Sequence, residues 1–135
     1  MSVVQSKRGQ GELEVLTKAR ELATYTIKIC TNEKSFPKRY RWCITNKIVE
    51  NAIEINSNIG KANDVYVTDG EDYRLRKEYQ NRAISEVGAI IGNIDIAYRV
   101  FGIDKDRTKH WVGLIIEVQT LLRAWKKSDI KRFKE

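Results

Sequence analysis

The sequence predicts an all-α protein with the up-down-up-down arrangement of a four-helix bundle, in one domain that spans residues 1–135. Three observations favour this fold class. Four segments carry apolar residues three and four positions apart, a spacing that gathers them on one face of a helix. The connections between these segments are short, as they are between antiparallel neighbours in a bundle. Eight glycines and one proline in 135 residues are too few for the many turns of an all-β chain.

The first helix is predicted from about Gly11 to Asn32, after a flexible N-terminus at residues 1–10. Its buried face is predicted to comprise Leu13, Leu16, Ala23, Ile27 and Cys30. In the second helix Ser35 is predicted as the N-cap and Pro37 in the first turn, where its missing N–H costs little. This helix is predicted to end near Gly60, and its buried stripe is predicted to comprise Tyr40, Ile44, Ile48, Ala52, Ile55 and Ile59.

The third helix is predicted from about Asp69 to Phe101 and ends at Gly102, a natural left-handed stop. A capping box is predicted at its start, in which Thr68 caps the helix and Glu71 reaches back. Small residues in its interior favour the close approach of a neighbouring helix, with tolerated surface glycines as the alternative: Ser85, Gly88 and Gly92.

The fourth helix is marked by an apolar stripe of six residues: Trp111, Leu114, Ile115, Val118, Leu122 and Trp125. Residues 126–135 are predicted as a basic C-terminal tail, in which Ser128 is able to cap one more turn. Since consecutive helices alternate in direction, the start of the second helix and the end of the fourth are expected at opposite ends of the bundle.

A second apolar stripe on each of the first two helices predicts a homo-oligomer, because a monomeric bundle needs one apolar stripe per helix. On the first helix this stripe consists of Val15, Leu22 and Ile29. On the second helix it consists of Trp42, Val49 and Ile53, and tryptophan is favoured at interfaces. These six residues are the predicted oligomer interface. Isolated exposed apolar residues are the alternative interpretation.

The balance of charge favours an anionic partner, nucleic acid first. The chain holds 25 Lys and Arg against 18 Asp and Glu, a net charge of +7. The excess gathers in two clusters, Lys34–Arg41 and Arg123–Lys134, and Arg74, Arg76 and Lys77 are expected to join the second. No base-reading motif is present. Binding is therefore expected to be driven by the phosphate backbone, steeply dependent on salt and weakly specific for sequence.

The sequence offers little for catalysis, and we expect no catalytic residue, no cofactor and no metal site. It contains neither a phosphate-binding P-loop motif nor a nucleophile elbow. The single histidine, His110, is expected to serve as a cap or packing residue. Cys30 and Cys43 have no partner at the spacing of a zinc site, and two cysteines are too few for a disulfide scaffold. These features predict a non-enzymatic protein of the reducing cytoplasm. A mean hydropathy of −0.50, without an apolar run of about 18 residues, predicts no membrane partner.

Three short motifs bear a family resemblance. They are Phe36 to Trp42 (Phe-Pro-Lys-Arg-Tyr-Arg-Trp), the pair Asn51-Ala52, and Leu122 to Asp129 (Leu-Arg-Ala-Trp-Lys-Lys-Ser-Asp). With them the chain resembles the accessory variability determinants of diversity-generating retroelements. Those proteins belong to a wider family of small four-helix-bundle proteins that includes the ribosomal-RNA intervening-sequence proteins. The resemblance covers the chain from about Leu13 to Arg132.

The resemblance implies a non-catalytic partner of the retroelement reverse transcriptase that assembles as a homopentameric barrel. Such a protein binds nucleic acid and, with the polymerase and template-repeat RNA, supports the mutagenic complementary-DNA synthesis that diversifies a target gene. By position, the resemblance assigns nucleic-acid or polymerase binding to Lys38, Arg39, Arg41, Arg123, Lys126, Lys127, Lys131 and Arg132.

Two other functions remain open. One is a bundle protein associated with ribosomal-RNA insertions, without a reverse transcriptase. The other is an oligomeric adaptor whose basic patches bind an acidic protein. Co-purification separates the three, because only the retroelement factor should retain both a reverse transcriptase and its RNA.

Overall fold

The computed structural model describes residues 3–133, and it describes the side chains of residue 12 and of residues 14–133. This part of the chain is all-helical and contains no strand. Four long helices form the bundle: α1 (Val3–Cys30), α2 (Asn46–Asp64), α3 (Gly70–Phe101) and α4 (Lys105–Arg132). Two short turns precede α2, the 3-10 turn η1 (Lys38–Tyr40) and the π turn η2 (Arg41–Thr45). The predicted four-helix architecture is thus confirmed, but the predicted flexible N-terminus is wrong from Val3 onward, because α1 begins there and not near Gly11.

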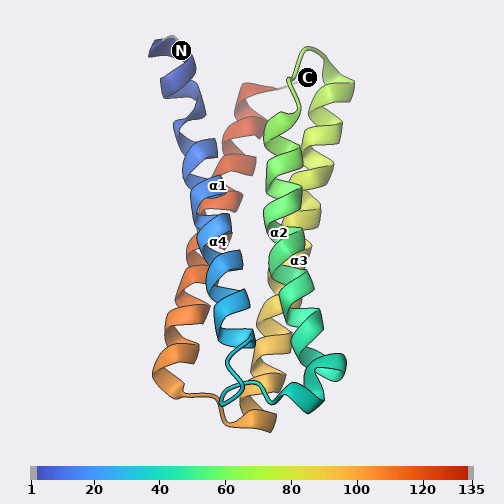
Figure 1. The fold of residues 1–135 in the computed structure, drawn as a ribbon. Coiled ribbons are helices and arrows are strands. Elements are labelled where there is room, and N and C mark those ends of the chain that lie inside the picture. The colour runs from blue at the N-terminus through green and yellow to red at the C-terminus, as the bar shows by residue number, and fades with distance from the viewer. Residues whose placement is uncertain (1–2, 134–135) are drawn as a thin grey trace.

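The helices alternate in direction, and each packs against its two neighbours around the bundle (Figure 1). The end of α1 and the start of α2 lie at one end of the bundle together with the end of α3 and the start of α4. The end of α2, the start of α3 and the end of α4 lie at the other. No helix among the described residues is long and apolar enough to cross a membrane.

The buried face of α1 matches the predicted one in part, since Leu16 and Cys30 are buried and Ala23 is half-buried. Val15, Leu22 and Ile29 lie in the bundle core, whereas Ile27 is exposed. The side chain of Leu13 lies outside the described residues. Because Ala19 and Thr26 are also buried, the core stripe runs through five positions spaced four and three residues apart: Val15, Ala19, Leu22, Thr26 and Ile29. Assigning Val15, Leu22 and Ile29 to an interface between copies is therefore wrong, since these side chains already fill the bundle.

The hydroxyl at position 26 explains why this stripe is hidden in the sequence. Thr26 looks like a surface residue, yet its Oγ1 accepts a hydrogen bond from Nε1 of the buried Trp111 at 2.9 Å. The pair satisfies both polar atoms inside the core, which removes the cost of burying them.

The start of the second helix is irregular where a continuous helix was predicted. Pro37 precedes η1, no side chain caps that turn, and Ser35 is buried instead of capping. The α-helical part begins at Asn46 and runs through Gly60 to Asp64. Of the predicted stripe, Ile48, Ala52, Ile55 and Ile59 are buried, Ile44 is half-buried and Tyr40 is exposed.

The start of α3 is capped one residue later than predicted. Asp69 is the N-cap, and its carboxylate accepts a hydrogen bond from the backbone N–H of Asp72 at 2.9 Å. The carboxylate of Asp72, and not that of Glu71, reaches back to Thr68, whose N–H and hydroxyl donate at 3.0 and 2.6 Å. At the other end Gly102 adopts the predicted left-handed conformation, with φ of 62°.

Two further expectations for α3 and α4 are wrong. Gly88 and Gly92 are exposed, and a Cβ added to either would meet nothing within 4 Å, so no neighbouring helix approaches them.

The fourth helix begins earlier than its apolar stripe, at Lys105, with Asp104 as the N-cap. It then continues through Ser128 to Arg132, so that residues 126–132 form the last turns of α4 and not a separate tail.

Candidate nucleic-acid interface

The basic residues predicted to bind nucleic acid lie at both ends of the bundle, as the alternating directions of the helices require. We call one end the Trp42 end; it comprises residues 31–45, the last turn of α3 and the first turn of α4. The other is the Arg76 end; it comprises residues 65–69, the first two turns of α3 and the last turns of α4. Lys38, Arg39 and Arg41 belong to the Trp42 end. The Arg76 end carries the remainder: Arg74, Arg76, Lys77, Arg123, Lys126, Lys127, Lys131 and Arg132.

Arg76 is buried, so its assignment as a phosphate-binding residue is wrong. Its side chain is 6% exposed. Its guanidinium donates to both carboxylate oxygens of Asp129, from Nε at 2.8 Å and from Nη2 at 3.1 Å. Nη2 also donates to Glu12 Oε1 at 2.6 Å. The guanidinium is therefore already engaged by these two carboxylates and by the ring of Trp125, whose centre lies 4.9 Å from Cζ.

This cluster ties three helices together. Glu12 belongs to α1, Arg76 to α3 and Asp129 to α4, and Gln80 adds a hydrogen bond to Asp129 Oδ2 at 2.8 Å. Two polar atoms in the cluster, Gln80 Oε1 and Trp125 Nε1, are buried without a hydrogen-bond partner among the described residues. The arrangement is structural: it closes the bundle at the Arg76 end with a buried, charge-assisted network.

The charge pattern predicts an exposed Arg76 here and not a buried network, although the sequence does carry a signal for the network. Arg76 and Gln80 continue the core stripe of α3, which is Tyr73, Arg76, Gln80, Ala83, Val87, Ile90, Ile94 and Ala97. Asp129 likewise follows Leu122 and Trp125 on the core stripe of α4. A basic residue and an acidic residue that both continue a core stripe at the same end of a bundle point to a buried ion pair.

The other cations of the Arg76 end are more accessible. Lys77 and Lys126 are half-buried, and Lys77 Nζ lies 5.9 Å from the ring centre of Tyr73. Arg132 is within 3.7 Å of Glu12 and lies over the ring of Phe133. Arg74, Arg123, Lys127 and Lys131 are also exposed and make no ion pair among the described residues.

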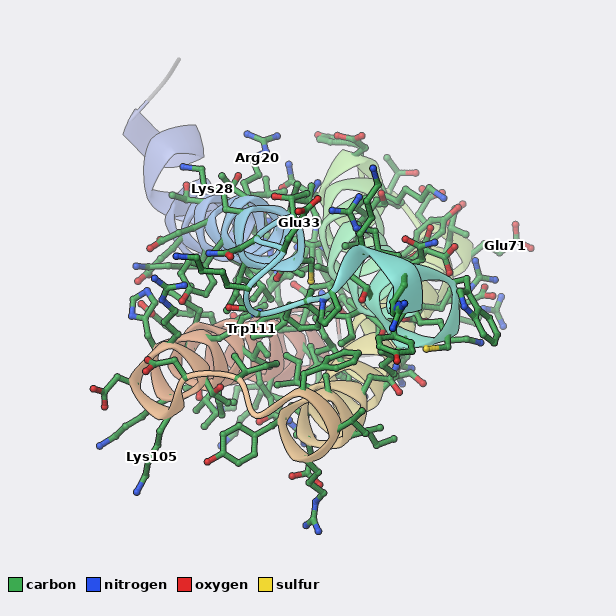
Figure 2. All side chains as sticks on the ribbon, turned by 60° about the horizontal axis from the view of Figure 1, so that its bottom comes forward. Arg20, Lys28, Glu33, Glu71, Lys105 and Trp111 are labelled. Carbon is green, nitrogen blue, oxygen red and sulfur yellow. The ribbon has the colours of Figure 1, made fainter. Side chains whose placement is uncertain are left out.

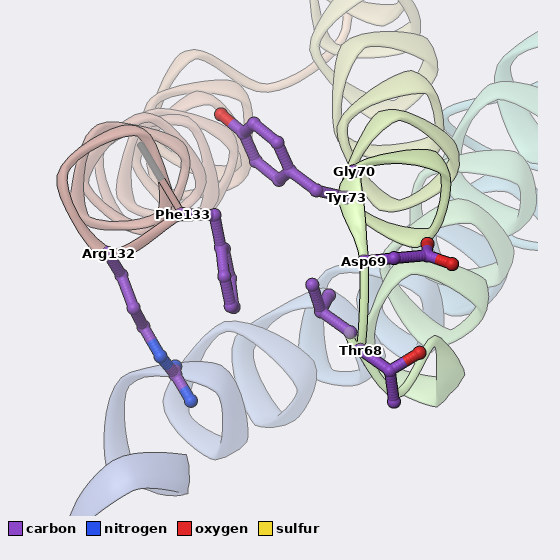
Figure 3. Close-up of a pocket in the computed structure, with 7 residues that line it drawn as sticks. Thr68, Asp69, Gly70, Tyr73, Arg132 and Phe133 are labelled. Carbon is purple, nitrogen blue, oxygen red and sulfur yellow. The ribbon is translucent and has the colours of Figure 1, made fainter. Parts of the chain in front are cut away.

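A pocket of about 290 Å³ opens beside Arg132 at the start of α3 (Figure 3). Thr68, Asp69, Gly70, Tyr73 and Phe133 line it together with Val67. The pocket matches a phosphate poorly, because the carboxylate of Asp69 already accepts the helix N–H of Asp72 that an anion would seek.

At the Trp42 end, which also contains Glu33 and Asp106, the positive charge gathers in one segment. Residues 34–49 contain five Lys and Arg and no Asp or Glu. None of the five makes an ion pair within the described part of the chain. Lys38 and Arg39 are exposed, and Arg41 is half-buried with no hydrogen-bond partner for its Nε. Such cations gain an interaction from a phosphate without giving up an internal ion pair, although Arg39 also lies over the ring of Tyr40, 5.8 Å from its centre.

An aromatic layer fixes the backbone beneath these cations. Phe36 is fully buried, with its ring centre 5.7 Å from that of Phe101 and 5.9 Å from that of Trp111, both edge-on. Tyr40 stacks on Phe101, with the ring centres 5.9 Å apart. Figure 2 looks onto this end and shows Trp111 among the helices while Lys105 points outward. The loop is thus anchored by its apolar residues, which leaves its charged residues outside.

The π turn η2 sets the position of Trp42. The N–H of Asn46 donates to the carbonyl of Arg41, five residues back, where an α-helix would join residues four apart. Across this turn Thr45 is buried and Trp42 is 77% exposed. Of the other residues assigned to the oligomer interface on the second helix, Val49 is half-buried against the core and Ile53 is 42% exposed.

Cys30, Cys43 and His110 each have a separate environment in the described part of the chain. Burial raises the pKa of the Cys30 thiol to about 12, which keeps it protonated. Cys43 is exposed, and its Sγ donates to the carbonyl of Tyr40 at 3.0 Å. His110 is exposed and packs edge-on against Tyr25, with ring centres 4.9 Å apart. Within residues 3–133 no three His, Cys, Asp or Glu side chains are grouped to hold a metal ion.

No protein-family model, curated protein or solved structure matches this chain.

Proposed function

We propose that this chain is a non-catalytic accessory protein of a diversity-generating retroelement that binds the reverse transcriptase and template-repeat RNA and supports mutagenic complementary-DNA synthesis. The observation that carries the proposal is the Trp42 end, where residues 34–49 hold five cations, no carboxylate and no internal ion pair. One of the motifs that carry the family resemblance, Phe36 to Trp42, lies within this segment.

Nucleic acid is the partner that best suits this chemistry. Phosphates spaced along a strand attract a patch of cations over a long range and release condensed counterions on contact. Lys38 and Arg39 are exposed beside one another, and arginine offers a planar donor fork that suits phosphate oxygens. The affinity supplied by such contacts falls steeply as the salt concentration rises.

Two separate basic surfaces suit a protein that holds an RNA and its polymerase at the same time. The Trp42 end is one, and the exposed cations Arg74, Arg123, Lys127 and Lys131 at the Arg76 end are the other. They lie at opposite ends of the helices, so that occupation of one leaves the other open. We assign RNA to the Trp42 end and the polymerase to the Arg76 end.

Assembly into a homopentamer is part of the same proposal and derives from the resemblance. With Val15, Leu22 and Ile29 in the core, Ile53 on α2 is the exposed aliphatic residue left from the predicted interface. Its neighbours on the chain include the half-buried Val49. We therefore place the contact between copies on this face of α2.

The test is co-purification of the chain expressed together with its neighbouring genes, with proteins identified by mass spectrometry and nucleic acid by staining across a salt series. Recovery of a reverse transcriptase with a structured RNA supports the proposal. RNA without a polymerase favours a protein associated with ribosomal-RNA insertions, and an acidic protein without RNA favours an adaptor. Either of these two results contradicts the retroelement function.

Two charge-reversal variants, compared in the same experiment, test which end of the bundle binds the RNA. Arg39→Glu should release the RNA at a lower salt concentration than the wild type. The matched control is Arg20→Glu, which makes the same change in net charge at an exposed position on α1. Equal release by the two variants would contradict the assignment of RNA to the Trp42 end.

A further inference from the structure

Trp42 is exposed in a protein whose other two tryptophans are buried. The chain contains three tryptophans, of which Trp111 and Trp125 are 0% and 6% exposed. Trp42 is 77% exposed, and among the described residues no ring or cation packs on its indole. An indole face that remains open to water, on a backbone held in place by the aromatic layer beneath it, is available to a partner.

The charges around Trp42 restrict the chemistry of that partner. Lys38 and Arg39 precede it by one helical turn, and Lys47 follows. Since residues 34–49 lack any carboxylate, two copies of the chain that met through this segment would bring like charges together. The surface fits a partner that joins negative charge to flat aromatic faces. Single-stranded nucleic acid has both, because its phosphates alternate with bases whose faces are free.

We propose that Trp42 is a stacking platform for an unpaired base, so that the Trp42 end prefers single-stranded nucleic acid, including the unpaired segments of a folded RNA, to a duplex. This inference rests on the proposed binding of nucleic acid and names the form that is bound. Trp42 stacks on the base, and Lys38 and Arg39 contact the flanking phosphates. In a duplex the faces of the bases are covered by their stacked neighbours, which leaves Trp42 without a contact.

The π turn gives Trp42 this role. The extra residue in the Arg41–Thr45 turn lets Thr45 join the core while Trp42 points away from it. Insertions of this kind are common at functional sites in helices, where they re-aim one side chain. The nearby exposed aromatic residue, Tyr40, already stacks on Phe101 and is therefore the lesser platform.

The experiment compares the binding of the full chain to a labelled, unstructured single-stranded oligonucleotide and to the duplex of the same sequence, by fluorescence anisotropy at fixed salt. Trp42→Ala is expected to weaken binding of the single strand about tenfold, the usual cost of losing one base–aromatic stack, and to leave duplex binding unchanged. Trp42→Phe should restore most of the affinity, because the ring is kept. The matched control is Tyr66→Ala, which removes an aromatic side chain that is 74% exposed at the opposite end of the bundle.

The outcomes separate this inference from the proposed function. If the wild type binds neither probe, both fail. If it binds both probes and Trp42→Ala changes neither affinity, or lowers the two equally, the nucleic-acid function stands and the stacking role is wrong. A smaller mass of Trp42→Ala in light scattering, with unchanged binding of the single strand, would place Trp42 between copies of the chain and would also overturn the inference.

Discussion

Arg76 and Asp129, 53 residues apart in the sequence, are joined by two hydrogen bonds of 2.8 and 3.1 Å in the interior of the bundle. The pair connects the start of α3 to the end of α4, and the ring of Trp125 covers the guanidinium. Arg76 looks in the sequence like part of a basic surface, but in the structure it is a buried residue that stabilises the fold. The pair also explains why a carboxylate stands within the basic run near the end of α4.

Removal of either partner of this pair should destabilise the fold strongly. Arg76→Ala leaves the buried carboxylate of Asp129 without its cation, and Asp129→Ala leaves the guanidinium without its bidentate acceptor. Each is expected to lower the free energy of unfolding by about 3–5 kcal/mol in urea denaturation. The control is Arg74→Ala, two residues away and exposed, with an expected change within about 0.5 kcal/mol.

The double variant tests whether the two residues act as a pair. Because each single change strands the other charge, Arg76→Ala/Asp129→Ala should cost clearly less than the sum of the two single changes. Strict additivity, or single losses no larger than that of Arg74→Ala, would show that the ion pair does not hold α3 to α4.

Aspartate substitutions at Leu22 and at Ile53 should have different effects. Leu22 is fully buried, so Leu22→Asp is expected to place an unpaired charge in the core and to unfold the chain or to cost more than about 4 kcal/mol. Ile53 is 42% exposed, so Ile53→Asp is expected to stay folded.

Light scattering of the folded Ile53→Asp variant tests the proposed oligomer, since a charge on the contact face of α2 should reduce the mass. Circular dichroism supplies the control for folding. A folded Ile53→Asp variant with the mass of the wild type would move the contact between copies away from α2.

The two open glycines of α3 predict stabilising substitutions. Gly88→Ala and Gly92→Ala each add a methyl group that meets nothing within 4 Å, and alanine favours the helix by about 0.8–1 kcal/mol over glycine. Each variant should therefore raise the urea midpoint without changing the slope of the transition. A loss of stability at either position would mean that another molecule packs against this face of α3.

The two cysteines should differ sharply in reactivity. The thiolate is the reactive form, and burial holds the pKa of Cys30 at about 12, so that this thiol is protonated at neutral pH. In the native protein a thiol reagent should therefore modify one cysteine, Cys43, and it should modify both in urea. Cys43→Ser removes the native reaction if this assignment holds. A native reaction that persists in Cys43→Ser would contradict the burial of Cys30.

Much of the fold follows from the sequence because the helices have regular stripes and clear ends. The bounds of α3 are predicted to within a residue, since Asp69 and Gly102 have strong preferences for the cap and for the left-handed stop. The errors arise where polar residues continue a core stripe. Thr26 on α1 and Arg76 on α3 are buried because partners on α4, Trp111 and Asp129, satisfy them, and such a partner is not visible within one helix.

The candidate site is predictable in composition but not in geometry. The charge of the Phe36–Trp42 motif is visible in the sequence, as is its aromatic content. The π turn is not, because it depends on the fit of Thr45 and Phe36 into a core formed by other helices. Without that turn the exposed Trp42 looks like one member of an apolar stripe on a regular helix.

The central claim is that the Trp42 end binds nucleic acid through its unpaired cations, and the most direct test is the salt dependence of RNA binding. The dissociation constant of the wild type and of Arg39→Glu would be measured from about 50 to 200 mM salt, with Arg20→Glu as the matched control. We expect steep salt dependence for the wild type and Arg20→Glu, and for Arg39→Glu weaker binding with a slope smaller by about one. Identical affinities and slopes for Arg39→Glu and Arg20→Glu would contradict it.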